Sequence, residues 1–344
     1  MTPTALPLAG RVVIERIESR LLVGNRPGDP AFRDVPVYLP PSYDTTPSRR
    51  YPTIYMLAGY SGTGMSFVGY SCFSPTLPQR LDTLMRSGCM NEAIVVMADA
   101  MTRYGGSQYV DSSATGPYQR FVADETVAHI DARHRTLATR ESRAVAGKSS
   151  GGYGALRLAL ERGDVFGACA CHAGDMYFEY AYLPDIPKAA STMTAFGSLA
   201  AWLEHFEQAP KKRSSDFTAI NITAMAAAYS PDDEGGEGDG FGIWMPFDFE
   251  TGALREAIWQ RWLTHDPVRM LEAGAAALQR LSCLYIDVGS SDEYNLHLGA
   301  RIFRKQLNAL GVKHHYEEFA DGHRDTSYRY ERSLPMLAQA LRAD

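Results

Sequence analysis

Short apolar runs alternate with segments of helical spacing along most of the chain. The run at 93–97 (AIVVM) is continuously apolar, which is typical of a parallel strand buried on both faces. Comparable runs predict further strands at 11–22, 35–39, 53–57, 143–146, 166–171, 284–288 and 315–319. Apolar residues at helical spacing predict helices at 77–86, 118–132, 152–161, 296–310 and 327–341. This alternation predicts an α/β fold with a mostly parallel, eight-stranded sheet flanked by helices.

The stretch from 174 to 266 does not follow this alternation. It contains an aromatic segment at 177–182, one predicted helix at 199–206 and all four tryptophans of the chain. We therefore expect an α/β core made of residues 1–173 and 267–344. Residues 174–266 are expected to form an insertion that folds over the sheet as a cap or lid.

Acidic residues gather among glycines at 230–240, within this insertion. Their arrangement could suggest a calcium loop. The alternating Asp and Asn positions and the closing Glu of an EF-hand are missing, however. We expect a mobile acidic loop here and no metal site.

The composition argues against several classes of protein. Of the 344 residues, 45% are hydrophobic and 22% are charged, which is ordinary for a globular chain with a large core. The formal net charge of -6 argues against a general nucleic-acid binder, which needs clustered Lys and Arg. No stretch approaches the roughly 20 apolar residues of a membrane span. The oligomeric state stays open, with a homodimer as one option.

The cysteines and the N-terminal residues indicate the cellular compartment in which the protein is expected. The five cysteines are scattered without a CxxC pair, so neither a disulfide framework nor a zinc site is indicated. The first seven residues show neither the basic start nor the apolar run of a signal peptide. We expect a cytoplasmic protein, although a secreted form that had lost its leader would look the same.

The strongest chemical signal is the sequence Gly-Lys-Ser-Ser-Gly-Gly at 147–152. It contains Gly-x-Ser-x-Gly centred on Ser149, between a predicted strand and a predicted helix. A nucleophilic serine on a tight strand-to-helix turn needs small residues two positions before and two positions after it. Ser150 is a weaker candidate, because Lys148 stands two positions before it. A phosphate-binding P-loop would need a glycine where the chain has Ser142.

A serine hydroxyl is a weak nucleophile near neutral pH and needs a base. His323 follows the last predicted strand, where a loop can reach the serine turn, and is our candidate for this base. The acid that orients the imidazole should follow the strand at 284–288. Asp292 is preferred there to Asp287, which lies inside the strand, and to Glu293, which is one position further on.

An oxyanion formed at this serine would need two backbone N–H donors. We expect one from Ser150, directly after the nucleophile, and one from Tyr60 in the glycine-rich loop at 57–64. Four further residues are expected near the substrate pocket: Tyr109, His172, Met176 and Trp244.

With these residues, the chain resembles the esterase D-like family of α/β-hydrolases. That family includes S-formylglutathione hydrolases, feruloyl and acetylxylan esterases, enterochelin esterases and mycolyl transferases. The resemblance implies the α/β-hydrolase fold, a catalytic triad of Ser149, Asp292 and His323, and an oxyanion hole made by the N–H groups of Tyr60 and Ser150. It is carried by the segments 35–43, 51–57, 124–125, 130–131, 144–155, 289–292 and 322–323.

The chain departs from this family in three places. Ala58 precedes Gly59 where family members often have His-Gly, and Lys148 stands where they usually have a smaller apolar residue. The insertion at 174–266 is not a common feature of the family, and it would shape the acyl or alcohol pocket.

The predicted activity is that of a serine carboxylesterase, which hydrolyses a small ester through an acyl-enzyme without a metal or an organic cofactor. A thioesterase of the S-formylglutathione hydrolase type and an acyl transferase would use the same residues. A non-catalytic binding protein on the same scaffold is a third alternative. The sequence specifies neither the acyl group nor the alcohol.

Overall fold

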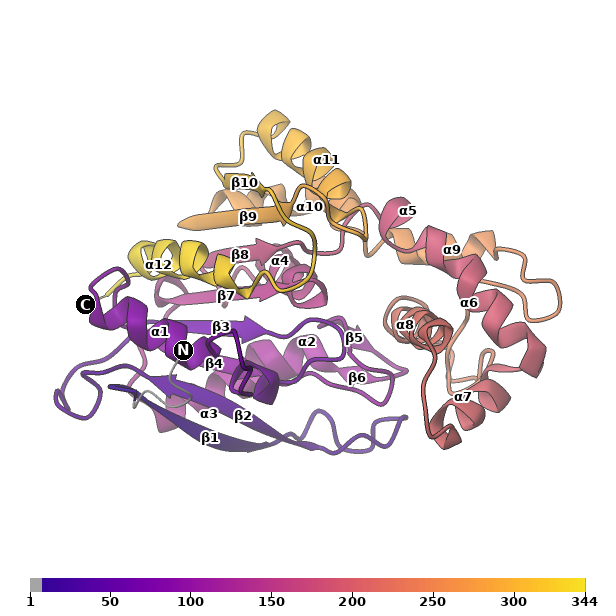
Figure 1. Ribbon diagram of the computed structural model, residues 1–344, viewed down its shortest axis with the longest axis horizontal. Helices are drawn as coiled ribbons and strands as arrows, with labels where there is room; N and C mark the ends of the chain where they lie inside the picture. The colour runs from indigo at the N-terminus through magenta and orange to yellow at the C-terminus, as the bar shows by residue number, and fades with distance from the viewer. Residues whose placement is uncertain (1–7, 344) are drawn as a thin grey trace.

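A central sheet organises the computed structural model, which describes residues 8–343 (Figure 1). The segment on which the signal-peptide prediction rests, residues 1–7, lies outside the described residues. The strands of this sheet are β1 (Arg11–Glu18), β2 (Phe32–Leu39), β3 (Thr53–Leu57), β4 (Ile94–Ala98), β7 (Arg143–Lys148), β8 (Ala168–His172), β9 (Cys283–Gly289) and β10 (His315–Phe319). Their order is β1-β2-β4-β3-β7-β8-β9-β10. β1 and β2 run antiparallel to their neighbours and the other strands are parallel, which confirms the predicted α/β architecture.

Helices cover both faces of the sheet, and this explains the continuous apolar runs. In β4, Ile94 and Val96 pack into the core on one face, whereas Val95 and Met97 pack into the core on the other. The first core also contains α3 (Val127–Arg133), α4 (Ser150–Glu161), α10 (Pro267–Gln279) and α11 (Leu296–Ala309). The second contains α1 (Leu77–Arg86) and α12 (Tyr330–Ala340). Because successive side chains of a strand point to opposite faces, both sets of positions must be apolar.

The largest error in the predicted strand boundaries lies at β1. The sequence suggested a strand up to residue 22, but β1 ends at Glu18. The backbone N–H groups of Arg20 and Leu21 donate to Glu125 at 2.9 and 3.1 Å, so the chain leaves the sheet at this point. Glu125 belongs to a helical segment that runs from α2 (Tyr118–Arg120) through a π-helical turn (Phe121–Thr126) into α3.

Five helices form a lobe on one side of the sheet, at the right of Figure 1. They are α5 (Phe178–Ala181), α6 (Ile186–Met193), α7 (Leu199–Gln208), α8 (Ser214–Tyr229) and α9 (Glu256–Leu263). The lobe has a core of its own, which includes Trp202, Tyr229 and Trp262 and joins the main domain through Tyr153 of α4. This lobe occupies the stretch assigned to the cap, and its movement as a lid stays a prediction.

Two carboxylates of the acidic loop at 230–240 bind groups of the lobe itself. Asp232 accepts hydrogen bonds from the backbone N–H groups of Glu234 and Gly238 at 3.2 and 3.1 Å. Asp239 accepts from the backbone N–H of Met245 at 2.8 Å and pairs with Arg255 at 2.6 Å. No group of three or more His, Cys, Asp or Glu side chains within residues 8–343 is arranged to hold a metal ion.

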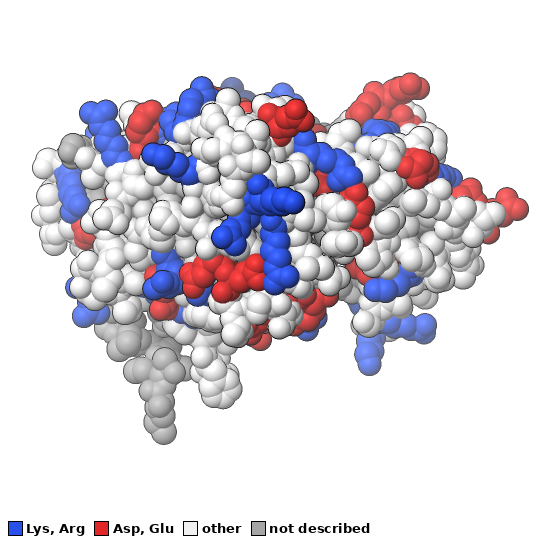
Figure 2. Space-filling view, turned by 90° about the horizontal axis from the view of Figure 1, so that it is seen from above, with Lys and Arg blue, Asp and Glu red and all other residues white. Residues whose placement is uncertain are grey.

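Charges of both signs are interspersed on the face of the molecule shown in Figure 2, without a continuous basic or acidic patch. Across residues 8–343, no helix is both long enough and apolar enough to cross a bilayer.

His265 joins the lobe to the main domain. Its ring stacks on Tyr229 of α8, with 5.1 Å between the ring centroids. Its Nδ1 accepts a hydrogen bond from the guanidinium of Arg157 in α4 at 2.8 Å. Burial, together with the positive charges of Arg157 and Arg261, lowers the pKa of His265 to about 3. The folded protein therefore holds this imidazole in its neutral form.

We expect His265 to make the protein sensitive to mild acid. The unfolded chain takes up a proton at this residue as the pH falls through 6.5, whereas the folded chain does so only near pH 3. The contribution of His265 to the free energy of unfolding is therefore complete above pH 6.5. It falls by about 1.4 kcal/mol per pH unit as the pH drops from 6.5 towards 3. Urea unfolding across this range should show a steeper loss of stability for the wild type than for His265→Gln, whose side-chain oxygen can still accept from Arg157. The exposed His205 supplies the control variant His205→Gln, and equal slopes in all three proteins would contradict the assignment.

Candidate active site

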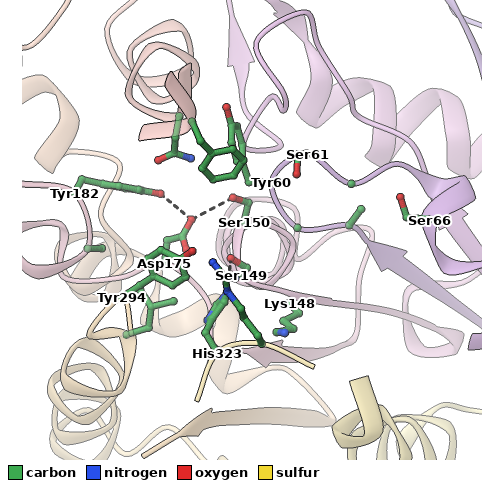
Figure 3. Close-up of a pocket in the computed structure, with 18 of the residues that line it drawn as sticks. Tyr60, Ser61, Ser66, Lys148, Ser149, Ser150, Asp175, Tyr182, Tyr294 and His323 are labelled. Carbon is green, nitrogen blue, oxygen red and sulfur yellow. Dashed lines mark hydrogen bonds between the residues drawn. The ribbon is translucent and has the colours of Figure 1, made fainter. Parts of the chain in front are cut away.

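Ser149 occupies the turn between β7 and α4. Its backbone has φ 59° and ψ −128°, which is a costly conformation for a residue with a side chain. The turn is held because the Ser149 N–H donates to the carbonyl of His172 at 2.9 Å, while its own carbonyl accepts from Tyr153 at 2.8 Å. The strained turn projects the side chain into a cavity of about 610 Å³ (Figure 3).

The glycines of the motif are required by close backbone packing. A Cβ atom at Gly147 would collide with the backbone of Gly151, and one at Gly151 would collide with the carbonyl of Leu57. Strand β7, the serine turn and the loop after β3 can therefore pack this closely only without side chains at both positions. This is the physical basis of the spacing recognised in the sequence.

The structure brings Ser149, His323 and Asp292 together in one hydrogen-bonded series. His323 Nε2 lies 3.0 Å from Ser149 Oγ, and His323 Nδ1 lies 2.7 Å from Asp292 Oδ2. Asp292 is 3% exposed and His323 is 8% exposed, so the pair is shielded from bulk water. An imidazole held in this way can take a proton from the hydroxyl, and the carboxylate can stabilise the imidazolium that forms.

Two loops position this pair, one after β9 and one after β10. Asp292 Oδ1 accepts the backbone N–H of Tyr294 at 2.9 Å, which leaves Oδ2 for the imidazole. Glu293 accepts the backbone N–H of His323 at 2.6 Å. The loops approach so closely at Gly289 that a Cβ atom there would collide with the backbone of Gly322. Tyr294 packs its ring edge-on against the imidazole, at 4.9 Å between ring centroids.

Asp287, the alternative acid, belongs to a second buried pair. It lies 2.6 Å from Nδ1 of His172, whose Nε2 lies 2.7 Å from Ser333 Oγ. Its other oxygen accepts from Arg329 at 2.8 Å. Burial would raise the pKa of Asp287, but His172 and Arg329 outweigh it and the pKa lies below the ordinary value. This group is fully enclosed and lines no part of the cavity at Ser149.

The two predicted oxyanion donors flank the serine. Ser150 is the first residue of α4, where helix geometry leaves the backbone N–H without a partner inside the helix. The loop that carries Tyr60 lies against the serine turn, since a Cβ atom at Gly59 would be 3.4 Å from that of Ser149. Both Tyr60 and Ser150 line the cavity. Within residues 8–343, the N–H of Tyr60 donates to no protein acceptor.

The four residues predicted near the pocket lie elsewhere, and none of them lines the cavity. Tyr109 is buried beneath the Tyr60 loop and donates its hydroxyl to the carbonyl of Ala58 at 2.7 Å. His172 points into the second buried pair described above. Met176 is 1% exposed and packs against Gly299 of α11. Trp244 belongs to the loop after α8, where its backbone pairs with Ser230.

Besides the predicted catalytic and oxyanion residues, the cavity is lined by residues that were not predicted to be near the substrate. Asp175, Tyr182, Phe217 and Tyr294 all face it, and Figure 3 shows three of them around Ser149. Asp175 had a usable signal, because it follows the end of β8 at the same sheet edge as the serine turn. Phe217 had none, since α8 reaches the cavity only through the packing of the lobe.

Lys148 lies beside the nucleophile and also lines the cavity. Burial lowers the pKa of its ammonium group, and the nearby carboxylates of Asp292 and Asp325 offset this only in part. Lys148 therefore places a partly desolvated cation on one flank of Ser149.

Comparison with known sequences identifies an esterase relationship over nearly the whole chain. Residues 31–338 match a family model described as "Putative esterase". An esterase of Mycobacterium tuberculosis is 30% identical over 142 residues, which cover 41% of this chain and 28% of that protein. An endo-1,4-beta-xylanase/feruloyl esterase of Xylanibacter ruminicola is 27% identical over 147 residues, covering 41% of this chain and 19% of that protein. The matched part is thus less than a third of either relative's length.

Solved structures resemble the whole chain. A ferulic acid esterase aligns with a TM-score of 0.63 and 18% identity, over 97% of this chain and 100% of that chain. An S-formylglutathione hydrolase from Agrobacterium tumefaciens aligns with a TM-score of 0.58 and 17% identity, over 99% of both chains. At such identities the likeness establishes the fold, which is that of the α/β-hydrolases.

Proposed function

The chain belongs to the esterase family of ester-hydrolysing enzymes, and from that premise we propose that it is a serine carboxylesterase whose nucleophile is Ser149. One observation carries the proposal. The hydroxyl of Ser149, the imidazole of His323 and the carboxylate of Asp292 are joined by contacts of 3.0 and 2.7 Å at the wall of a cavity. This is the connectivity that general-base activation of a serine requires.

In the first half of the reaction, Ser149 Oγ attacks the ester carbonyl carbon as its proton passes to Nε2 of His323. The tetrahedral intermediate then breaks its bond to the leaving-group oxygen, which takes that proton and departs as the alcohol. The acyl group stays on Ser149 as an ester. Asp292 holds Nδ1–H throughout and stabilises the imidazolium.

In the second half, water attacks the acyl-enzyme and gives its proton to the same Nε2. Collapse of the second tetrahedral intermediate returns the proton to Ser149 Oγ and releases the carboxylic acid. Both intermediates carry a negative oxygen, which the N–H groups of Tyr60 and Ser150 would stabilise. Each such donor is worth about 10² to 10³ in kcat.

The cavity supports a small or medium-sized ester as the substrate. Its volume is about 610 Å³, and Tyr60, Tyr182 and Phe217 give it aromatic walls. Aromatic acyl groups, such as those implied by the names of the feruloyl esterase relatives, are therefore reasonable first substrates.

Two assays test this proposal. We expect hydrolysis of short and medium p-nitrophenyl esters, together with covalent labelling of one residue, Ser149, by a fluorophosphonate probe. Absence of both turnover and labelling would overturn the proposal in favour of a binding protein.

Two further experiments distinguish the alternative activities. A matched pair of oxygen ester and thioester, sharing one acyl group, separates the carboxylesterase from the thioesterase. Added alcohols reveal an acyl transferase, because transesterified products would then replace the free acid.

A further inference from the structure

Asp175 is a buried carboxylate in the wall of the cavity that the proposed chemistry does not use. It follows β8, is 7% exposed and lies next to the proposed oxyanion donor Ser150. Its Oδ2 accepts from the hydroxyl of Tyr182 at 2.7 Å, from Nε2 of Gln108 at 3.1 Å and from Oγ of Ser150 at 3.4 Å. Figure 3 shows the contacts with Tyr182 and Ser150, directly beside Ser149.

All three of these donors reach the same oxygen. Within residues 8–343, Oδ1 receives no hydrogen bond, and no Lys, Arg or His side chain lies within ion-pair distance of the carboxylate. Burial raises the pKa of Asp175, and the bonds from Tyr182 and Gln108 offset this only in part. A buried carboxylate with no counter-charge in contact costs free energy, and a bound cation would reduce this cost.

The surrounding structure fixes the orientation of Asp175. Gln108, which is 1% exposed, adopts a positive φ of 52° and places its amide against the carboxylate. Tyr182 is similarly buried, with its ring against Tyr229 and Trp262. Rigid partners on one oxygen and an open second oxygen are the features of a preorganised binding group.

The nearby part of the cavity wall suits a cation. Tyr60, Tyr182 and Phe217 supply aromatic rings, whereas the carboxylate of Asp185, which also lines the cavity, is already paired with Lys188 at 2.7 Å. Tyr60 and Phe217 contact each other edge to face at 5.6 Å between centroids. Carboxylates combined with aromatic faces attract ammonium groups. Two basic side chains, Lys148 and Arg324, also line the cavity, and Figure 3 shows Lys148 on the other side of Ser149 from Asp175.

We propose that Asp175 binds a protonated amine of the substrate, so that this enzyme acts on esters that carry an ammonium group. The inference rests on the proposed esterase function and names the substrate class for the same site. Oδ1 is the acceptor in this assignment, and the aromatic rings cover the apolar part of the cation.

Competitive inhibition tests the assignment without knowing whether the amine belongs to the acyl or the alcohol part. The probes are benzylammonium and benzyl alcohol, which are similar in size and share the ring, and the reporter is p-nitrophenyl butyrate hydrolysis near neutral pH. For the wild type, we expect an inhibition constant at least about tenfold lower for benzylammonium, equivalent to about 1.4 kcal/mol. Asp175→Asn should bind both probes equally. The charge-matched control Asp164→Asn, at the opposite edge of the sheet, should keep the preference.

Two results would overturn the assignment. The first is equal binding of benzyl alcohol and benzylammonium by the wild-type protein, which can be measured without any variant. The second is an ammonium preference that survives in Asp175→Asn. In that second case, loss of the preference in Asp185→Asn would assign it to Asp185 instead. Calorimetric titration of Ser149→Ala with both probes measures binding without turnover, so a failure of the esterase proposal stays distinguishable from a failure of this one.

Discussion

Replacing Ser149 with alanine is expected to lower kcat for p-nitrophenyl butyrate by about 10⁴ to 10⁶. The side chain has one protein partner of consequence, Nε2 of His323 at 3.0 Å, and this contact carries the proton out of the attacking hydroxyl. Alanine keeps the backbone geometry of the turn, because serine and alanine have the same Cβ and face the same strain at φ 59°. The urea midpoint should therefore stay close to that of the wild type, so the loss of activity can be assigned to chemistry.

Ser150→Ala is the matched comparison, since Ser150 is the neighbouring candidate nucleophile. Its hydroxyl points to Asp175 at 3.4 Å, and its proposed part in catalysis is played by its backbone N–H, which alanine retains. The loss of kcat should be smaller than that of Ser149→Ala by orders of magnitude. Steady-state kinetics and fluorophosphonate labelling of both variants measure this. If Ser149→Ala is active and labelled while Ser150→Ala is inert, the nucleophile is Ser150 and not Ser149.

The serine turn could be predicted from sequence because a short motif between a strand and a helix carries its constraints. Gly147 and Gly151 are needed by contacts with nearby backbone, and the flanking strand and helix have clear apolar periods. His323 and Asp292 could be selected because strand order in a parallel sheet determines which loops share an edge. In these cases, chain position and a known strand direction were enough to place the residue.

The walls of the cavity could not be predicted, because they depend on packing across the lobe. Helix α8 shows why, since its residues are buried nearly all round from Ala219 to Tyr229 and give no amphipathic period. Its register against the main domain, and therefore the position of Phe217, is not encoded in a local pattern. Trp244 is a large aromatic residue of the insertion, but aromatic residues of the same stretch, such as Trp202 and Trp262, form the core of the lobe.

His172 shows a different limit of sequence reasoning. It ends β8 at the expected sheet edge, so its position along the chain resembles that of a pocket residue. Its side chain alternates to the face covered by α12, where Asp287 and Ser333 enclose it. The face that a side chain takes at the tip of a strand depends on register, and a register error of one residue reverses it.

Asp292→Asn should lower kcat by about 10⁴ while the protein stays folded. In the wild type, Oδ1 of Asp292 accepts the N–H of Tyr294 at 2.9 Å and Oδ2 faces Nδ1 of His323 at 2.7 Å. The amide oxygen of asparagine can keep the first contact, which places its NH₂ group against Nδ1. Nδ1 must then accept, so the imidazole proton moves to Nε2, and Nε2 can no longer take the proton of Ser149.

Asp287→Asn provides the matched control, because it alters an aspartate–histidine pair of nearly the same length, 2.6 Å, in the second buried group. The variant removes the buried carboxylate that faces Arg329, which then keeps only Glu317 as a carboxylate partner. Because a buried cation loses part of its compensation, we expect a loss of about 3 kcal/mol in unfolding free energy. Its folded fraction should keep a kcat near that of the wild type, because His172 and Asp287 line no part of the cavity. Urea unfolding and active-site-titrated kinetics of both variants would then separate a chemical effect from a structural one. A well-folded Asp287→Asn that loses as much kcat as Asp292→Asn would show that the second pair takes part in the chemistry.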